Sequence, residues 1–274
     1  MPFFESTGDT MVTNQFIRLT ADEKSRRGGL WNKVPVYSRA WEAVITFKVH
    51  GSSRSLAADG FAFWYVNQKK QEGGTFGGPD QFKGLGIMLD TYKNGASTGA
   101  FPRVSGFIND GTWNFDHASD GDKQSFGHCY AMGRNRDHDT DLKIRYKEKR
   151  LSVHVDVDGS GQWRLCFERL NVILPTGYFF GFTAATGDLT DNHDIIALRT
   201  YQIQTTDKPA DLEWAQETPR IDEVDPVRQE SVEEEEKKGS SVFMIIFVIL
   251  LIAGGGFGYV FLQKKKERER KRFY

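Results

Sequence analysis

The sequence has few cysteines and no excess of charge of either sign. Only two cysteines occur among 274 residues, and no zinc-finger spacing is present. The 36 lysine and arginine residues balance 37 aspartate and glutamate residues, which gives a formal net charge of −1. A balanced chain has no overall field that attracts nucleic acid, and no arginine-rich face with interleaved aromatics is evident. Zinc fingers and nucleic-acid-binding proteins are therefore disfavoured.

The common signatures of catalysis are also absent from the sequence. The glycine pairs at 73–74 and 77–78 have no following Lys-Ser or Lys-Thr, so no phosphate-binding loop is implied. No serine sits in a nucleophile elbow. No strand carries the alternating Glu-x-Asp-x-Glu carboxylates of a jelly-roll glycosidase, and no Asn-x-Ser/Thr acceptor for N-glycosylation occurs. We therefore expect a protein that is not an enzyme.

Short apolar or alternating segments, typical of β-strands, recur through the first 206 residues. Glycine, asparagine, aspartate and proline separate them, helical periodicity is almost absent, and Asn109-Asp110-Gly111 is the clearest hairpin signal. The expected strands are residues 43–49, 60–66, 86–90, 104–108, 142–146, 151–157, 177–184 and 195–204. Many strands in one domain predict an all-β fold, a sandwich or jelly roll over residues 1–206.

Residues after 206 change in character twice. Residues 207–241 are rich in Glu, Asp, Pro and Lys, which predicts a disordered acidic stalk. Residues 242–262 carry no charge, and in a helix that length crosses a hydrocarbon core of about 30 Å. A buried helix of a soluble domain is the alternative reading. Glycines at 254–256 and 258 allow close packing of this helix, which leaves room for a homo-oligomer.

The charges that flank the apolar segment indicate its orientation in a bilayer. Four glutamates at 233–236 precede it, and a basic tail at 263–274 follows it. Because basic flanks stay on the cytosolic side, we expect a single-pass type I membrane protein with a lumenal domain. Residues 1–30 show no signal peptide. We therefore expect a truncated N-terminus, the alternative being that the span itself directs insertion.

Both cysteines, Cys129 and Cys166, fall in the expected lumenal domain. In an oxidising compartment they are expected to form a disulfide, which would stabilise the fold by roughly 3–4 kcal/mol. Two buried free thiols are the alternative.

An oxygen-rich ligand spacing follows the apolar strand that ends at Asp90. Asp90 offers a carboxylate, Tyr92 a backbone carbonyl and Asn94 an amide oxygen, and Asp120 adds a carboxylate from a later loop. Hard oxygen donors of mixed charge suit calcium, and the lack of nearby cysteine disfavours zinc. The alternative is an ordinary polar loop after a buried strand.

Two further loops contain candidates for recognising a sugar. Asp59 lies where a turn enters an apolar strand, so its carboxylate can accept hydrogen bonds from a pair of sugar hydroxyls. Gly187, between Thr186 and Asp188, lets backbone N–H groups approach a ligand closely. Taken alone, each could be a plain turn. The segment 156–161 starts like an EF-hand loop but lacks the final acid, so a hairpin turn is expected there.

These residues together resemble the leguminous-type (L-type) lectins of the early secretory pathway, and in particular their vesicular integral-membrane group. The resemblance runs over residues 8–204 and resumes at the apolar span and tail. It rests on Asp22-Glu23-Lys24-Ser25, Trp41, Phe47 to Gly51, Asp59-Gly60, Leu89 to Asn94, Phe115 to Gly121, Arg134 to Asp139, Leu174 to Tyr178 and Gly187 to Asp194.

The resemblance implies a β-sandwich lectin domain that binds high-mannose glycans through one Ca²⁺ ion. The calcium ligands would be Asp90, the Tyr92 carbonyl, Asn94 and Asp120. The residues implied to contact sugar are Ser25, Asp59, Tyr92, Asn94, His117, Gly187, Asp188 and Leu189. The family also has a cis peptide before the sugar-binding aspartate, here Ala58–Asp59, and pairs cysteines at the positions of Cys129 and Cys166.

The implied biology is that of a cargo receptor for high-mannose glycoproteins. It would cycle between the endoplasmic reticulum, the intermediate compartment and the Golgi. The tail residues Lys271, Arg272, Phe273 and Tyr274 resemble sorting signals read by vesicle coat components. Two alternatives remain: a protein-binding cargo adaptor with a vestigial sugar site, and a membrane-anchored glycosidase.

Overall fold

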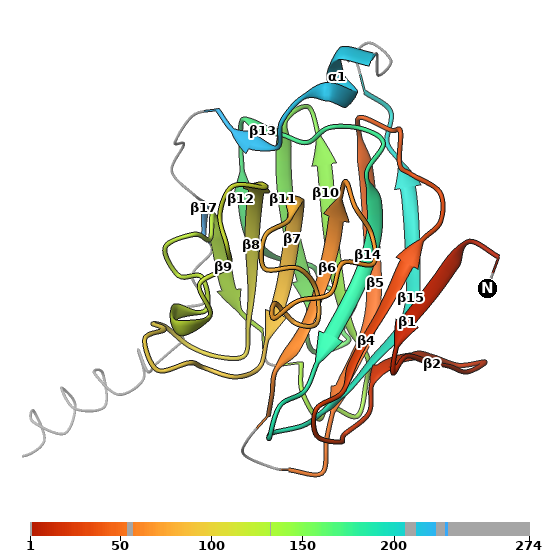
Figure 1. Ribbon diagram of the computed structural model, residues 1–274, viewed down its shortest axis with the longest axis vertical. Helices are drawn as coiled ribbons and strands as arrows, with labels where there is room; N and C mark the ends of the chain where they lie inside the picture. Colours follow the sequence, from red (N-terminus) through yellow and green to blue (C-terminus); the bar gives the residue numbers. More distant parts are fainter. Residues whose placement is uncertain (1, 54–56, 132, 206–211, 223–227, 230–274) are drawn as a thin grey trace, which may run out of the picture. The chain divides into compact units, whose positions relative to one another are not determined.

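Two antiparallel sheets lie face to face in the computed structural model, which describes residues 2–53, 57–131, 133–205, 212–222 and 228–229 (Figure 1). The seven-stranded sheet has the order β1 (Phe4–Gly8), β4 (Arg27–Asn32), β14 (Phe179–Ala185), β6 (Gly60–Val66), β7 (Lys83–Asp90), β8 (Arg103–Asp110) and β9 (Gly127–Tyr130). The eight-stranded sheet has the order β17 (Arg228–Gln229), β12 (Arg164–Arg169), β11 (Arg150–Asp156), β10 (Thr140–Lys147), β5 (Trp41–His50), β15 (Asn192–Gln202), β3 (Ile17–Thr20) and β2 (Met11–Val12). The prediction of an all-β sandwich is confirmed.

The core lies between the two sheets, and strand β5 shows how the sequence pattern produces it. Its side chains alternate between buried and half-buried along all ten residues, as expected for a strand with one face on a core. Trp41 at its start packs against the rings of Tyr65, Tyr146 and Phe180, with centroids 5.0–6.0 Å apart. Aromatic contacts of this kind add to the burial energy of about 1.5–3 kcal/mol per large apolar side chain.

Strand β6 is buried on both faces, because loops cover the seven-stranded sheet on the side away from the core. Phe61, Phe63 and Tyr65 face the core between the sheets. Trp64 instead belongs to a second apolar cluster, which includes Phe76 from the loop 67–82 and Phe115 from the loop 111–126. The two covering loops are thereby anchored on a rigid sheet.

The register of three neighbouring strands brings several polar residues to one end of the sandwich. Gly60 at the start of β6 pairs with Asp90 at the end of β7, and it also pairs with Ala185 at the end of β14. The residues next to these positions, Asp59 and the loop after Ala185, therefore lie beside Asp90. Strand alternation and register thus place the candidate sugar and calcium residues together.

The hairpin predicted at Asn109-Asp110-Gly111 does not form as a tight turn, although the consecutive strands β8 and β9 pair antiparallel. Strand β8 ends at Asp110 and β9 begins only at Gly127, so a long loop joins them. The Asn109 side chain stabilises the start of this loop: its Oδ1 accepts from the Gly111 N–H at 2.8 Å, and its Nδ2 donates to the Trp113 carbonyl at 2.7 Å. A turn does begin at Asn109, as predicted, but this turn leads into a long loop that contains the short 3₁₀ helix His117–Ser119.

Part of the segment predicted as an acidic stalk is folded. Helix α1 (Leu212–Gln216) is followed by β16 (Arg220–Ile221), which pairs with β13 (Val172–Ile173). The Trp214 Nε1–H donates to the Leu174 carbonyl at 3.0 Å, and Arg39 lies 3.9 Å from the Trp214 ring centroid. Ordered structure therefore extends past the expected domain end at residue 206, because an aromatic side chain gives this polar segment a place to pack.

The predicted membrane span at 242–262 and the tail at 263–274 lie outside the described residues. Within the part of the chain that is described, no helix is long and apolar enough to cross a membrane. The remaining stalk residues, 207–211, 223–227 and 230–241, are likewise outside the description.

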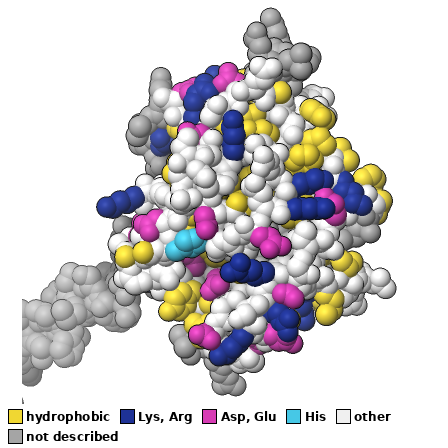
Figure 2. All heavy atoms as spheres, viewed as in Figure 1, with side chains coloured by type: hydrophobic (Ala, Val, Ile, Leu, Met, Phe, Trp, Pro, Cys, Tyr) yellow, Lys and Arg dark blue, Asp and Glu magenta, His cyan; other side chains and the backbone are white. Residues whose placement is uncertain are grey.

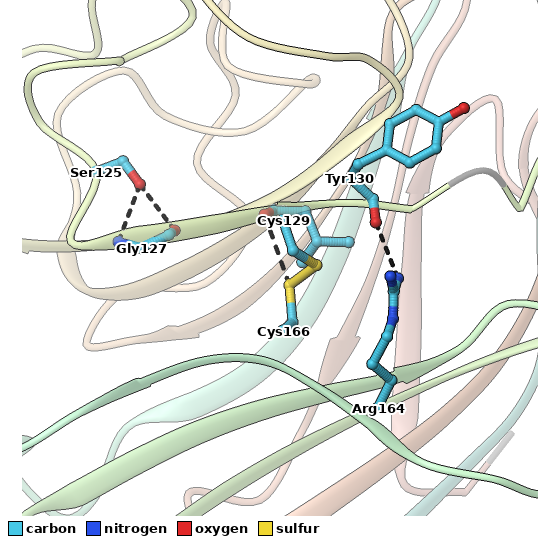
Figure 3. The surroundings of a disulfide bond; sticks show 7 residues. Ser125, Gly127, Cys129, Tyr130, Arg164 and Cys166 are labelled. Carbon is cyan, nitrogen blue, oxygen red and sulfur yellow. Dashed lines mark hydrogen bonds between the residues drawn. A yellow bond between two sulfur atoms is a disulfide. The ribbon is translucent and has the colours of Figure 1, made fainter. Parts of the chain in front are cut away.

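Cys129 and Cys166 form the expected disulfide, which excludes the alternative of two free thiols (Figure 3). The bond joins β9 of one sheet to β12 of the other, across a sequence separation of 37 residues. Close by, an Arg164 Nη2–H donates to the Tyr130 carbonyl at 2.9 Å, a second link between the same strands. The edge strand β9 of the seven-stranded sheet is therefore joined covalently to β12, the second strand of the other sheet.

Replacing both cysteines, Cys129→Ala with Cys166→Ala, should lower the free energy of unfolding by about 3–4 kcal/mol, because the unfolded chain gains loop entropy. Urea unfolding followed by tryptophan fluorescence measures the change. Wild-type protein treated with reductant should match the double variant. A loss below about 1 kcal/mol would show that the bridge does not constrain the unfolded chain.

Candidate functional site

Two carboxylates, Asp90 and Asp120, are buried at the centre of the candidate site. They are only 5% and 3% exposed, respectively. Asp90 ends strand β7, and its Oδ1 accepts from the Tyr92 N–H at 3.0 Å. Asp120 follows the 3₁₀ helix in the left-handed conformation, and its Oδ2 accepts from the Asn94 N–H at 2.9 Å. The side-chain amide of Asn94 donates to the other Asp120 oxygen.

The electrostatics of this pair are unfavourable without a cation. Burial, and after it the negative charge of Asp120, raises the pKa of Asp90 to about 8. The Tyr92 N–H and the positive charge of Arg103 oppose the shift only in part. Two buried carboxylates with an amide and a backbone carbonyl nearby are the hard, mixed-charge donors that Ca²⁺ accepts. The residues present therefore fit the expected ion.

A cluster of metal-binding side chains of the zinc type is not found in the described ranges. No group of three or more His, Cys, Asp and Glu side chains is arranged there so that these side chains alone could hold a metal ion. A site with two carboxylates completed by neutral oxygen donors agrees with this finding.

Asp59 lies next to the carboxylate pair and is linked to both neighbouring strands. The Ala58–Asp59 peptide bond is cis, as the resemblance implied. The Asp59 N–H donates to the Ala185 carbonyl at 3.2 Å, and its carbonyl accepts from the Thr91 N–H at 3.1 Å. Burial raises the pKa of the Asp59 carboxyl above its ordinary value. A carboxylate fixed in this way presents acceptor oxygens to a ligand without further ordering.

His117 borders the site from the 3₁₀ helix, where Asp80 positions it. The His117 Nε2 lies 2.9 Å from Asp80 Oδ1, and the ring meets Phe115 edge-on at 5.1 Å between centroids. Although burial raises the pKa of Asp80, hydrogen bonds from Thr75 and His117 lower it overall. A Cβ at position 74 would lie 2.9 Å from Asp80 Oδ1 and 3.0 Å from His117 Nε2, so a larger residue than glycine would displace these two side chains.

A pocket of about 250 Å³ brings most of these groups together. Six of its lining residues are sequence-predicted site residues: Asp59, Asp90, Tyr92, Asn94, His117 and Asp120. On the face shown in Figure 2, histidine and acidic side chains lie next to one another. Tyr92 is 40% exposed, so its ring is available to a ligand.

The other predicted sugar residues lie beside the pocket rather than in its lining. A Cβ on Gly187 would be 3.8 Å from Asp59 Oδ1, which places this loop against the carboxylate. The Ser25 N–H donates to the Gly187 carbonyl at 3.2 Å. Asp188 is exposed and forms an ion pair with Lys24 at 3.2 Å. Leu189 belongs to the same loop.

Three lining residues, Gly74, Phe76 and Phe115, were not predicted as site residues. The glycine pairs at 73–74 and 77–78 were noted only as lacking a phosphate-loop sequence. Their density within six residues was the one signal of a backbone that passes close to other groups. Phe76 carried no such signal, because aromatic residues are common throughout the chain, and Phe115 was noted only as the start of the motif Phe115 to Gly121.

A comparison with protein families identifies the chain. The model described as "Legume-like lectin family" matches residues 1–210. The chain belongs to the legume-like lectin family. The sequence resemblance is thereby confirmed, and the fold and the site geometry agree with it.

Relatives with names support this membership of the legume-like lectins. Vesicular integral-membrane protein VIP36 of Mus musculus is 39% identical over 225 residues, which are 81% of this chain and 63% of the relative. Protein ERGIC-53 of Rattus norvegicus is 30% identical over 206 residues, 74% of this chain and 40% of the relative. The chain thus spans less than two thirds of the length of these relatives.

A solved structure of the same family superposes on the chain. The VIP36 exoplasmic/lumenal domain in its Ca²⁺/Man2-bound form has a TM-score of 0.79 and 41% sequence identity. The match covers 82% of this chain and 92% of that one. Because the relatives are lectins, the glycosidase alternative loses its support.

The raised pKa of Asp90 predicts an unusual pH dependence of stability in the legume-like lectin domain without metal. Below about pH 4 the Asp90 carboxyl is protonated in both the folded and the unfolded chain. The contribution of this protonated group to the stability of the fold is then fully present. As the pH rises towards 8, the unfolded chain releases a proton that the folded domain still holds, so stability falls. In chelator, the melting temperature should therefore fall between pH 5 and pH 8.

The variant Asp90→Asn provides the control for this prediction, since it keeps the shape but cannot ionise. Its melting temperature in chelator should depend less on pH than that of the wild type. Parallel curves for the two proteins from pH 5 to pH 8 would contradict the shifted pKa. Differential scanning fluorimetry is sufficient for the measurement.

Proposed function

We propose that this protein is a calcium-dependent lectin that binds high-mannose N-glycans on glycoproteins. The observation that carries the proposal is the pocket in which Asp59 and His117 adjoin the buried Asp90–Asp120 pair. Membership of the legume-like lectin family supports it, as does the Ca²⁺/Man2-bound form of the related VIP36 domain.

In this proposal Asp90, the Tyr92 carbonyl, Asn94 and Asp120 hold the calcium ion. The ion supplies the positive charge that the two buried carboxylates need, and it favours their ionised form. The Asn94 amide would turn to bring its oxygen towards the ion, since its nitrogen now donates to Asp120. That rotation leaves the amide nitrogen as a donor for a sugar hydroxyl.

The remaining residues of the proposal recognise mannose directly. Asp59 would accept hydrogen bonds from neighbouring hydroxyls, and backbone N–H groups of the loop that starts at Gly187 would donate to the sugar. His117, already positioned by Asp80, would complete the polar contacts. The Tyr92 ring would pack on the apolar face of the sugar, and Ser25 and Asp188 would contact a neighbouring residue of the glycan. A rigid aspartate and backbone donors discriminate hydroxyl orientation.

At the level of the whole protein, we propose a cargo receptor of type I topology that cycles between the endoplasmic reticulum, the intermediate compartment and the Golgi. The support is the family membership together with the apolar segment and basic tail in the sequence. Its partners would be high-mannose glycoproteins on the lumenal side, the lipid bilayer, and vesicle coat components at Phe273-Tyr274. A homo-oligomer through the span is a further part of this proposal.

Two variants separate the calcium site from the sugar site. Asp59→Ala should retain calcium binding but lose mannose affinity by about tenfold or more, since one charged acceptor is removed. Asn94→Ala should weaken calcium binding as well as mannose binding, because this side chain serves both ligands. Calorimetric titration of the purified full-length chain in detergent, with Ca²⁺ and then with a mannose disaccharide, measures both constants.

The same titrations distinguish the alternative functions. A folded wild type that binds calcium but no mannose would favour a protein-binding adaptor with a vestigial sugar site. Mannose binding that persists unchanged in chelator and in Asn94→Ala would contradict the calcium-dependent proposal. Release of free sugar from a high-mannose glycan would revive the glycosidase alternative.

A further inference from the structure

A buried arginine, Arg103, lies directly behind the candidate calcium residues. Its side chain is 2% exposed, although it carries a full positive charge. One Nη2–H donates to the Asp120 carbonyl at 2.7 Å, and Nη1 donates to Asp122 Oδ1 at 2.5 Å. A further hydrogen bond from Nη1 reaches the Thr98 carbonyl at 3.3 Å. The guanidinium also lies 4.5 Å from the centroid of the Phe101 ring.

Asp122 extends this contact to the loop that carries Asn94. Its Oδ2 accepts from the Thr98 N–H at 2.6 Å and from the Thr98 hydroxyl at 2.7 Å. The Ala96 N–H donates to the Ala118 carbonyl at 3.1 Å between the same loops. The Arg103–Asp122 pair therefore connects the backbone of Asp120 to the loop after β7. These are the two loops from which the candidate calcium ligands come.

A second buried ion pair, Arg134–Asp191, lies behind the other half of the site. Asp191 is fully buried, and both of its oxygens accept from Arg134: Oδ1 from Nη2 at 2.7 Å and Oδ2 from Nε at 2.8 Å. The same Nη2 also donates to the Ser53 carbonyl at 2.8 Å. Glycine is required at position 51, where a Cβ would lie only 2.1 Å from Asp191 Oδ1.

This second pair is linked to the loop of sugar candidates through Asp22. Asp191 ends the segment that contains Gly187, and the neighbouring Thr190 hydroxyl donates to Asp22 Oδ1. The other Asp22 oxygen accepts from the Ser52 N–H at 2.7 Å. The turn that starts at Asp22 also contains Ser25, whose N–H donates to the Gly187 carbonyl. Asp22 and the Arg134–Asp191 pair therefore hold together the turn at Asp22, the segment Ser52–Ser53 and the loop that ends at Asp191.

We propose that the two buried ion pairs position the two halves of the binding site independently. The Arg103–Asp122 pair holds the loops that carry the calcium candidates, and the Arg134–Asp191 pair holds the loop Gly187–Leu189 against Asp59. Arg103 binds Asp122 and the Asp120 backbone. Arg134 binds Asp191 and the Ser53 carbonyl. Arg103 and Arg134 are thus positioning residues, which act through the loops and contact neither ligand. This inference rests on the proposed lectin function.

The test is a comparison of two charge-conserving variants of the full-length chain, Arg103→Lys and Arg134→Lys. A lysine keeps the charge but cannot reproduce the forked hydrogen bonds of arginine. Arg103→Lys should weaken Ca²⁺ binding by about tenfold, as loss of outer-shell partners of a metal site does. At saturating Ca²⁺ the bound ion would hold these loops in place, so the affinity for a mannose disaccharide should stay close to that of the wild type.

Arg134→Lys should show the opposite pattern. Its Ca²⁺ affinity should be unchanged, while its disaccharide affinity at saturating Ca²⁺ falls by about tenfold, since the sugar loop is no longer held in place. A matched control is Arg150→Lys, because Arg150 forms an exposed ion pair with Glu168 at 2.9 Å on β11 and β12. The control should change neither constant.

The split between the two affinities separates positioning from a general loss of stability. A variant that was merely destabilised would lower the melting temperature and leave both constants unchanged in the folded fraction. That outcome, or an equal loss of both affinities in both variants, overturns the proposal. A wild type that binds neither Ca²⁺ nor the disaccharide instead contradicts the proposed function itself.

Milder variants keep the test valid if a lysine variant does not fold. Thr98→Ala removes one hydroxyl hydrogen bond to Asp122, and Thr190→Ala removes the one to Asp22. Thr98→Ala should weaken only Ca²⁺ binding, and Thr190→Ala should weaken only disaccharide binding. Near-ultraviolet circular dichroism confirms the folded state, and the absence of this split in folded variants contradicts independent positioning.

Discussion

Repulsion between two buried carboxylates, Asp90 and Asp120, is the constraint around which this site is organised. Burial removes the water that would screen their charges, so one of them holds a proton at neutral pH in the absence of metal. Arg103 lies behind the pair, but its hydrogen bonds go to the Asp120 backbone and to Asp122, not to the two carboxylates. In the proposed function, a cation that prefers oxygen ligands would compensate the two negative charges beside the groups that would contact a sugar.

The sandwich keeps the two buried carboxylates in place because rigid strands and anchored loops surround the site. The antiparallel register aligns the ends of β6, β7 and β14, and the disulfide joins β9 of one sheet to β12 of the other. On the loop-covered side, Phe76 and Phe115 pack into an apolar cluster with Trp64. The loops that carry Gly74 and His117 are therefore anchored close to the pocket, and ligand binding would cost little ordering entropy.

Much of this organisation could be predicted from the sequence, for reasons that differ between elements. The alternating strand β5 and the continuously apolar strand β6 both have a clear pattern, and the motifs around Asp59 and Asp90 are local in sequence. Strand β4, with glycine at 28 and 29, and the four-residue β9 have too weak a pattern to be recognised. The ion pairs Arg103–Asp122 and Arg134–Asp191 join residues that only the fold brings together, as does the contact of Trp214 with the sandwich.

The central claim, that a cation compensates the Asp90–Asp120 pair, is tested most directly by counting protons. Calcium would be titrated calorimetrically at pH 7 in buffers of different ionisation enthalpy. Because the pKa of Asp90 is raised to about 8 without metal, the account predicts one calcium site and the release of about one proton on binding. The variant Asp90→Asn should release none. Calcium binding without proton release in the wild type, or no saturable calcium binding at all, would contradict the account.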